Sequence, residues 1–328
     1  METNKPDLSI LPPPPSVIRT LVRGFNTVAN HIYLILLPVL LDVFLWLGPH
    51  IKATPVFDQL GEAIKQSGQQ IPQEITTLFT DFSMNFNLFS VIRTVPVGVF
   101  SLFSASLSSE NPLGQNLVIN TLSVEDVFVK LLAANLIGMI LGAIYFHFVS
   151  TLTLQPKKHF SMPKQVANVI LLNLAWMVVF IFMYLPVLLA AVLLTLIPDP
   201  IRSIFGLLLM IPVSWFAMFY YYSFFPIFVF DMSFWNSVKL TWKAIRFGLP
   251  TLGWFSIITL MLSQGMDYLW RSAPSTSWMS AVGILGHAFI ATGLLSASFI
   301  FFLENMFWIE LTLKTLNKNI EPGLPANE

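Results

Sequence analysis

The chain has 328 residues, of which 55% are hydrophobic and only 10% are charged. Soluble domains carry about 25% charged residues, so a surface that faces only water is excluded and much of the exterior must face lipid. Basic and acidic side chains number 17 each, so no net charge favours nucleic acid, and we expect no nucleic-acid partner. The absence of cysteine excludes disulfides and thiolate chemistry.

Residues 1–30 predict a cytoplasmic tail followed by an amphipathic helix. The proline run Pro12–Pro15 is typical of a stiff, extended tether. From Ser16 to Asn30, apolar residues recur at helical spacing, with Arg19 and Arg23 off the apolar face. This pattern indicates a helix that lies in the membrane interface.

Six apolar segments are long enough to cross a bilayer, which requires about 20 mostly apolar residues per helix. They are continuous and lack the alternation of a membrane β-barrel. We therefore expect an all-α integral membrane protein, a bundle of about six transmembrane helices with an interfacial amphipathic helix. The predicted spans are Val28–Leu47, Val127–Leu154, Val166–Leu196, Ile204–Phe230, Leu249–Leu269 and Met279–Leu303.

The largest segment outside the predicted membrane core is residues 48–126, inserted between the first two spans. Within it, Val56–Gln66 and Glu74–Phe89 have the pattern of short amphipathic helices. The segment Val91–Leu107 is fairly apolar, but Arg93 and several serines make it a poor spanning helix. We interpret it as a re-entrant or interfacial segment.

Basic residues gather in alternate connections between the spans, which sets the expected orientation. We expect the protein in the cell membrane, with both termini in the cytoplasm. The six-span membrane domain is expected over residues 31–310, and residues 311–328 are expected to form a cytoplasmic tail. The basic residues on the expected inner side are Lys5, Arg19, Arg23, Lys157, Lys158, Lys164, Lys239, Lys243, Arg246, Lys314 and Lys318.

The second predicted span carries a stripe of small residues, Ala134, Gly138 and Gly142, at four-residue spacing. Small residues allow two transmembrane helices to approach closely. The ordinary interpretation is packing within one subunit, and homodimerisation is the alternative. A homo-oligomer or a membrane-protein partner is therefore left open.

Residues 231–248 have the pattern of a basic amphipathic helix at the cytoplasmic surface. Ser233 is a candidate N-cap, and Lys239, Lys243 and Arg246 share one face. Anionic headgroups attract such residues by about 1 kcal/mol each. We expect contact with lipid headgroups, and a docking surface for a cytoplasmic partner is the alternative.

The stretch Phe225–Asp231, then Ser233 and Trp235–Lys243, ends a proline-containing helix in an acidic residue and begins an amphipathic helix. It resembles a pattern in bacterial six-helix inner-membrane proteins, similar to the membrane domain attached to some glycerophosphodiester phosphodiesterases. Thr241-Trp242 stands where that family has Ser-Trp, and no phosphodiesterase domain is evident. The resemblance implies membrane architecture and a bacterial setting, and no activity.

Four ionisable residues fall within or at the ends of the predicted spans: Asp42, His147, His287 and Glu304. Each charge in a span is unfavourable by roughly 2.5–3.5 kcal/mol on insertion scales, which marks these positions as candidate functional residues. The ordinary interpretation is an interhelical hydrogen bond for Asp42 and neutral, packed rings for the histidines. The alternative joins Asp42 with a histidine in a proton or ion path.

Known catalytic signatures are missing from the sequence: it has no H-E-x-x-H, Walker A, G-x-S-x-G or G-x-G-x-x-G pattern. We therefore expect no cofactor, no metal and no enzymatic activity. The favoured function is a non-enzymatic membrane component that interacts with lipids, with itself or with a partner. A transporter or permease-like subunit is the first alternative, and an intramembrane enzyme acting on lipid through Asp42, His147 or His287 is the last.

Overall fold

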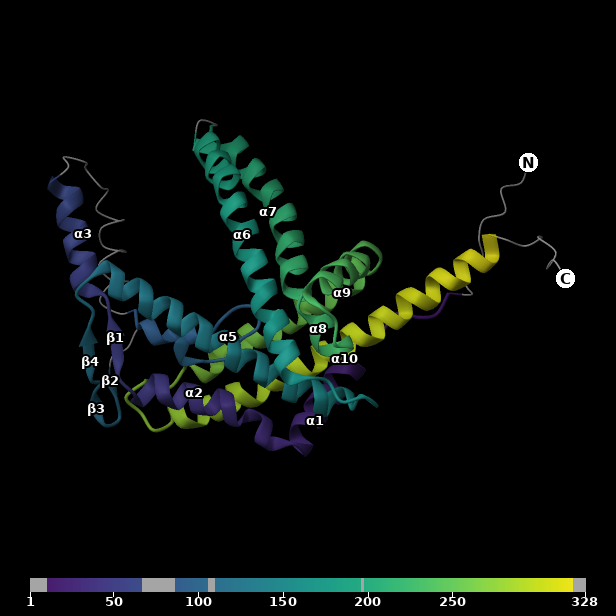
Figure 1. Cartoon of the computed structure of the whole chain (residues 1–328), viewed down its shortest axis with the longest axis horizontal. Helices are drawn as coiled ribbons and strands as arrows, with labels where there is room; N and C mark the ends of the chain where they lie inside the picture. Colours follow the sequence, from purple (N-terminus) through teal and green to yellow (C-terminus); the bar gives the residue numbers. More distant parts are fainter. Residues whose placement is uncertain (1–10, 67–85, 106–109, 196–197, 321–328) are drawn as a thin grey trace.

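The computed structural model describes residues 11–66, 86–105, 110–195 and 198–320. Helices make up most of this described part, and they confirm the predicted all-α membrane fold (Figure 1). Five of the described helices are long and apolar enough to cross a membrane, and a bent pair of helices is the sixth candidate. The five long helices are α5 (Val124–Leu154), α6 (Met162–Thr195), α7 (Asp199–Tyr222), α9 (Phe234–Trp270) and α10 (Ser280–Ile320).

The predicted first span, Val28–Leu47, begins too early. Its first residues belong to α1 (Val17–Asn30), which meets the following helical residues at an angle of 94°. The backbone leaves helical geometry at His31 (φ −130°, ψ 56°) and continues as η2 (Ile32–Ile35) and α2 (Leu36–Leu47). The apolar run is thus divided at a residue of modest helix propensity.

Helix α1 is amphipathic, as predicted, and its buried face lies on α10. Thr20, Gly24 and Val28 are buried at successive turns. A Cβ atom on Gly24 would lie 2.6 Å from the Ala297 amide nitrogen and 2.7 Å from the Gly293 carbonyl oxygen. Glycine is therefore required here, because the two helix backbones touch.

Glu304, a predicted intramembrane polar residue, lies at the same contact. Its carboxylate pairs with Arg23, and a second guanidinium, from Arg19, lies 3.7 Å away. Both arginine side chains are more than half exposed. Such pairs contribute up to about 1 kcal/mol each, so Glu304 serves mainly to orient α1 on α10.

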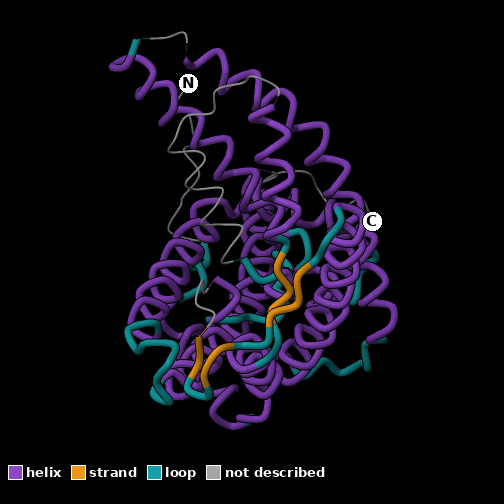
Figure 2. Tube along the Cα trace, turned by 90° about the vertical axis from the view of Figure 1, so that its left-hand side faces the viewer, coloured by secondary structure: helices purple, strands orange, loops and turns teal. Residues whose placement is uncertain are grey.

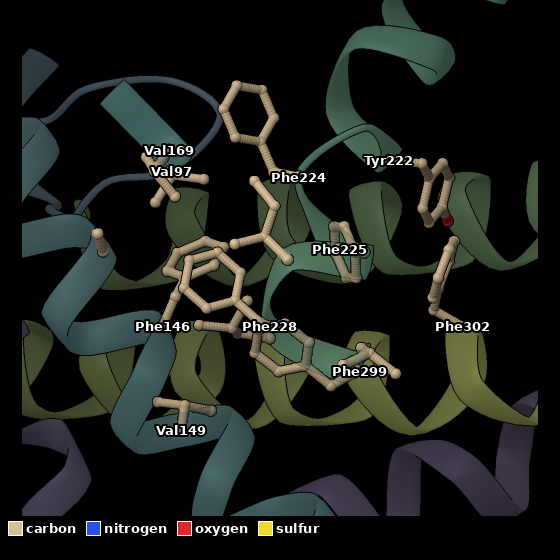
Figure 3. Close-up of a cluster of buried hydrophobic side chains, with 14 of the residues drawn as sticks. Val97, Phe146, Val149, Val169, Tyr222, Phe224, Phe225, Phe228, Phe299 and Phe302 are labelled. Atoms are coloured by element: carbon tan, nitrogen blue, oxygen red, sulfur yellow. The ribbon is translucent and has the colours of Figure 1, made fainter. Parts of the chain in front are cut away.

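An aromatic core joins the middle of the bundle (Figure 3). The predicted fourth span breaks after Tyr222 and resumes as the short helix α8 (Phe225–Phe230). From α8, Phe228 lies 5.4 Å from the ring of Phe146 on α5, and Phe225 lies 5.3 Å from Phe299 on α10. Aromatic pairs at this spacing add about 0.5–1.5 kcal/mol each beyond area burial.

The break in the fourth span determines which face of α9 is buried. Two carbonyl oxygens near the break accept hydrogen bonds from side chains of α9. The Ser237 hydroxyl donates to the Ser223 carbonyl oxygen at 2.6 Å, and the Thr241 hydroxyl donates to the Tyr222 carbonyl oxygen at 3.2 Å. The buried stripe is therefore small and polar. The large aromatic Trp242 lies off this stripe and is 50% exposed.

Two predicted boundaries also differ from the structure. The Ser233 side chain makes no cap hydrogen bond, and the Phe234 amide instead donates to the Asn168 side chain at 2.9 Å. The last helix does not end at Leu303 but continues to Ile320, well into the predicted cytoplasmic tail. An i,i+4 ion pair of 2.8 Å between Glu310 and Lys314 supports the extension.

Helices α6 and α7 project together from the rest of the bundle (Figure 1). Their large apolar side chains are exposed over most of their length, with Phe182 at 76% and Leu207 at 72%. Both helices run continuously through the internal prolines Pro186 and Pro212. An apolar surface of this extent requires lipid or a protein partner to cover it.

The inserted segment forms a cap, which we define as residues 48–66 and 110–123. Its strands pair locally (Figure 2): β1 (His50–Lys52) runs parallel to β4 (Val118–Asn120), and β2 (Glu110–Asn111) antiparallel to β3 (Gly114–Gln115). Helix α3 (Thr54–Gln66) confirms the helix predicted over nearly the same residues. The second predicted helix, residues 74–89, lies mostly outside the described residues.

His50 is the buried titratable side chain of the cap. Its Nε2 lies 2.9 Å from Asn116 Nδ2 and 3.2 Å from the Leu45 carbonyl oxygen. Burial lowers the pKa of His50 below the ordinary histidine value, against the opposing effect of the Leu45 carbonyl, and nearby Lys52 adds to the lowering. The neutral ring is thus the form that the folded cap holds.

We expect the cap to loosen in acid. Because the folded pKa of His50 lies below the unfolded value of about 6.5, its stabilisation is complete above that value and is lost as the pH falls through the folded pKa. Hydrogen exchange of the Thr121 amide, which bonds the Lys52 carbonyl at 2.8 Å, measures this opening. The His50→Gln variant should show no such pH dependence, and equal protection of the wild-type amide at about pH 7.5 and about pH 5 would contradict the prediction.

Candidate functional site: a buried charged cluster under a re-entrant segment

The segment 86–105 enters the bundle without forming a spanning helix. It contains two short 3-10 turns, η3 (Leu88–Ile92) and η4 (Phe103–Ala105), and its apolar residues Val97 and Val99 are buried. The described part of the predicted re-entrant segment is therefore irregular and mostly packed against protein, with Val95 exposed. Irregular backbone is tolerated at membrane depth where protein buries it.

The small-residue stripe of α5 is covered by this segment. A Cβ on Gly138 would lie 2.2 Å from the Ile92 carbonyl oxygen, and one on Gly142 would lie 2.5 Å from the Gly98 Cα. Ala134, one turn earlier, is 7% exposed. The stripe thus packs within one chain, and its partner is a loop rather than a helix.

Asp42 holds the deep end of the re-entrant segment. Its carboxylate is fully buried and accepts hydrogen bonds from the Ser101 hydroxyl at 2.5 Å and from the Leu102 and Phe103 amides at 3.0 Å each. Hydrogen bonds to a charged group are stronger than neutral ones. The hydrogen-bond partners of Asp42 thus lie on the segment 86–105, whereas the sequence predicts them on a neighbouring helix.

His287 of α10 pairs with Asp267 of α9. The distance from Nδ1 to the Asp267 Oδ1 is 2.7 Å, and both side chains are almost completely buried. Asp267 lies near the end of the fifth predicted span, Leu249–Leu269, and is not among the four candidate ionisable residues named from the sequence. Its position inside an apolar run is the signal that could have identified it.

These pairs belong to one charged cluster, defined here as Asp42, Arg93, Asp267, Arg271 and His287. Asp42 lies within electrostatic reach of His287, and Arg93 lies within reach of Asp42, Asp267 and Arg271. The Arg93 guanidinium also donates to the Ser104 hydroxyl at 3.1 Å. The re-entrant segment thus brings a cation between two buried carboxylates, which offsets the penalty of burying them.

His147 lies apart from the cluster. Its Nδ1 is 2.8 Å from Gln165 Oε1 on α6, and Gln165 donates to the Ile227 carbonyl at 3.1 Å. Asp42, His147 and His287 therefore make separate hydrogen bonds, each with other residues. An intramembrane hydrolytic site would need two of these side chains to contact each other. Their hydrogen bonds in the described part of the chain go to other residues.

The predicted headgroup residues lie on the exposed face of the first part of α9. Lys239 is 5.4 Å from the centre of the Trp235 ring, and Arg246 is 5.4 Å from that of Phe247. Lys243 is exposed between them. Gly248, where the backbone leaves helical geometry, separates this basic portion from the apolar remainder of α9.

Among the described residues, no group of three or more histidine, aspartate or glutamate side chains could hold a metal ion. Fold and site together define an all-helical integral membrane protein whose bundle encloses Asp42, Asp267 and His287. Searches of known protein families, of curated proteins and of solved structures give no match. The resemblance to phosphodiesterase-attached membrane domains therefore stays a prediction.

Proposed function

We propose that the chain is a non-enzymatic transporter or permease-like subunit of the cell membrane. The observation that supports it is the charged cluster: two carboxylates, the Arg93 guanidinium and an imidazole lie inside an apolar bundle, with the exposed Arg271 at its edge. Ionisable groups buried in membrane helices are unfavourable and typically mark a route for an ion or a polar solute. The re-entrant segment, with Tyr220 donating to the Val95 carbonyl at 2.7 Å, supplies irregular backbone beside that route.

The cluster changes the order of preference that the sequence suggested. In the sequence, Asp42 is a single charge within an apolar run. A membrane protein with no transport activity would explain one such charge equally well. In the folded chain Arg93 lies within electrostatic reach of Asp42 and Asp267, which the sequence does not relate. A purely structural role would be met by fewer buried charges, since apolar residues of similar volume stabilise a core equally well or better.

Ion and solute flux in proteoliposomes tests this function. The purified chain is reconstituted, and proton, potassium and sodium flux and the uptake of labelled amino acids and sugars are compared with empty vesicles. We expect flux of at least one species in the wild type, and its loss in Arg93→Gln but not in the exposed-face control Lys239→Gln. A wild type that matches empty vesicles for every species would overturn the proposal.

A second candidate function is a membrane component that binds lipids, a second copy or a protein partner. It is favoured by the exposed apolar surface of α6 and α7 and by the basic face of α9. Both proposed functions place the chain in a bacterial inner membrane with its two termini in the cytoplasm. Native mass spectrometry from nanodiscs tests this second function. We expect the wild type to retain anionic lipid, and the amount of bound lipid should fall when Lys239, Lys243 and Arg246 are all replaced by glutamine. A monomer that shows no lipid preference would refute it.

A further inference from the structure

Two arginines on the surface of α1 share one acidic partner. Arg19 and Arg23 are about one helical turn apart, and the described carboxylate that pairs with both is Glu304 of α10. Arg23 donates a hydrogen bond to it, whereas the nearest Glu304 oxygen lies 3.7 Å from the Arg19 guanidinium, beyond hydrogen-bond distance. Like charges at this spacing on a helix repel each other, so one of the two guanidinium groups lacks a compensating charge. The Arg19 side chain is the more exposed of the two, at 66%, and its N–H groups are the ones available to a second anion.

The backbone of α1 adds to the positive potential around Arg19. This residue lies in the first turn of the helix, directly after the N-cap Ser16, and the turn contains no acidic residue. The partial positive charge of a helix N-terminus favours an anion at this end. An anion beside Arg19 therefore meets two sources of positive charge, the guanidinium and the helix dipole.

An exposed apolar stripe runs beside the arginines. Ile18 and Val22 each precede an arginine by one residue, and they are 76% and 52% exposed. Exposed apolar residues beside cationic side chains are typical of a helix that lies in a membrane interface with its apolar side towards the acyl chains. A free phosphate ion would cover only the guanidinium groups. A phospholipid covers both stripes, because it carries a phosphate and acyl chains in one molecule.

The position of α1 along α10 agrees with a place among lipid headgroups. Gly24 touches α10 at Gly293 and Ala297. From this contact the arginine side chains extend to Glu304, about two turns nearer the C-terminal end of α10. Twenty-four residues separate Glu304 from Ser280 at the other end of α10, which is about 36 Å of helix. Because the hydrocarbon core is about 30 Å thick, a helix that enters it near Ser280 brings Glu304 to the opposite headgroups.

We propose that Arg19 and Arg23 bind the phosphate of an anionic phospholipid whose acyl chains cover Ile18 and Val22. A guanidinium presents a planar fork of N–H groups that fits two oxygens of one phosphate. The phosphate competes with Glu304 for the same two side chains. A zwitterionic lipid fits less well, because its cationic group meets the uncompensated guanidinium charge. This site lies on a different helix from the basic face of α9, and it does not depend on transport.

Native mass spectrometry of the full chain in detergent, titrated with dioleoylphosphatidylglycerol, tests the site. We expect the wild type to bind this lipid more tightly than dioleoylphosphatidylcholine. Arg19→Gln should weaken phosphatidylglycerol binding by about fivefold, the effect of one basic residue at an anionic surface. This variant keeps the hydrogen bond between Arg23 and Glu304, so α1 stays in place.

Glu304→Gln should have the opposite effect, since it removes the carboxylate that competes with the phosphate. We expect phosphatidylglycerol binding to become about fivefold tighter. Lys158→Gln is the matched control, because it removes one exposed positive charge from the loop between α5 and α6 and leaves α1 unchanged. Its affinity for both lipids should equal that of the wild type.

A distance between α1 and α10 separates lipid binding from displacement of the helix. The chain has no cysteine, so spin labels on Asn26→Cys and Phe307→Cys report these two exposed positions alone. The distance should be unchanged in Arg19→Gln. A shift in that variant would show that Glu304 already compensates Arg19, which overturns the proposal. If Glu304→Gln shifts the distance, Arg19→Gln alone decides.

Three binding results would also overturn the proposal. The first is equal affinity of the wild type for the two lipids, and the second is unchanged phosphatidylglycerol binding in Arg19→Gln. The third is inorganic phosphate that binds as tightly as the lipid, which would indicate a site for the free ion. If phosphatidylglycerol binding is lost only when Lys239, Lys243 and Arg246 are replaced, the lipid lies on α9. That result refutes the site on α1 and leaves the second candidate function intact.

Discussion

Asp42→Ala is expected to destabilise the protein by about 3–5 kcal/mol, because three buried donors lose the acceptor that they share. The carboxylate is the shared acceptor for the Ser101 hydroxyl and for the Leu102 and Phe103 amides. Its removal leaves these buried donors unsatisfied, at a penalty of about 1–3 kcal/mol per group. It also leaves Arg93 with one carboxylate fewer in reach.

The free energy of unfolding in mixed detergent micelles measures this loss. Asp58→Ala is the matched control, because Asp58 is exposed on α3 and its removal should change stability by no more than about 0.5 kcal/mol. Asp42→Asn should fall between the two, since it keeps the shape and part of the acceptor capacity but removes the charge. Equal stability of Asp42→Ala and Asp58→Ala would mean that Asp42 does not hold the re-entrant segment.

Gly142→Leu is expected to have an effect of comparable size, for a steric reason. The added Cβ would lie 2.5 Å from the Cα and 2.7 Å from the amide nitrogen of Gly98, so backbone must move before any larger side chain fits. Overpacking of a filled interior typically costs about 1–3 kcal/mol, and displacement of a whole segment lies at or above the upper end of that range. Unfolding free energy and protease sensitivity of the re-entrant segment should both report it.

Gly206→Leu on α7 is the matched control, because no atom lies within 4 Å of a Cβ placed there. It should be neutral or stabilising, since leucine favours a helix over glycine by up to about 1 kcal/mol. The same pair of variants separates the two interpretations of the small-residue stripe. A stripe that serves only homodimerisation predicts that Gly142→Leu dissociates the dimer and leaves the monomer's stability intact, which is the opposite of our expectation.

The fold class and most of the helices could be predicted from the amino-acid sequence alone. Whether a segment suits oil or water depends on its own side chains, so the spans from Val127 onward could be located without knowledge of their neighbours. The amphipathic helix before the first span and α3 of the cap were predictable for the same local reason, as were the charged positions that the apolar runs contain.

Which of these charges lie close together could be seen only in the folded chain. Asp42 and Ser101 are 59 residues apart, and Asp267 and His287 are 20 apart across a turn, so no periodicity within one helix relates them. The buried face of α9 likewise depends on another segment, because its hydroxyl groups donate to carbonyl oxygens at the break in the fourth predicted span. Hydrophobicity and helical period are properties of a segment, whereas hydrogen-bond satisfaction and charge balance belong to pairs of segments that only the folded chain brings together.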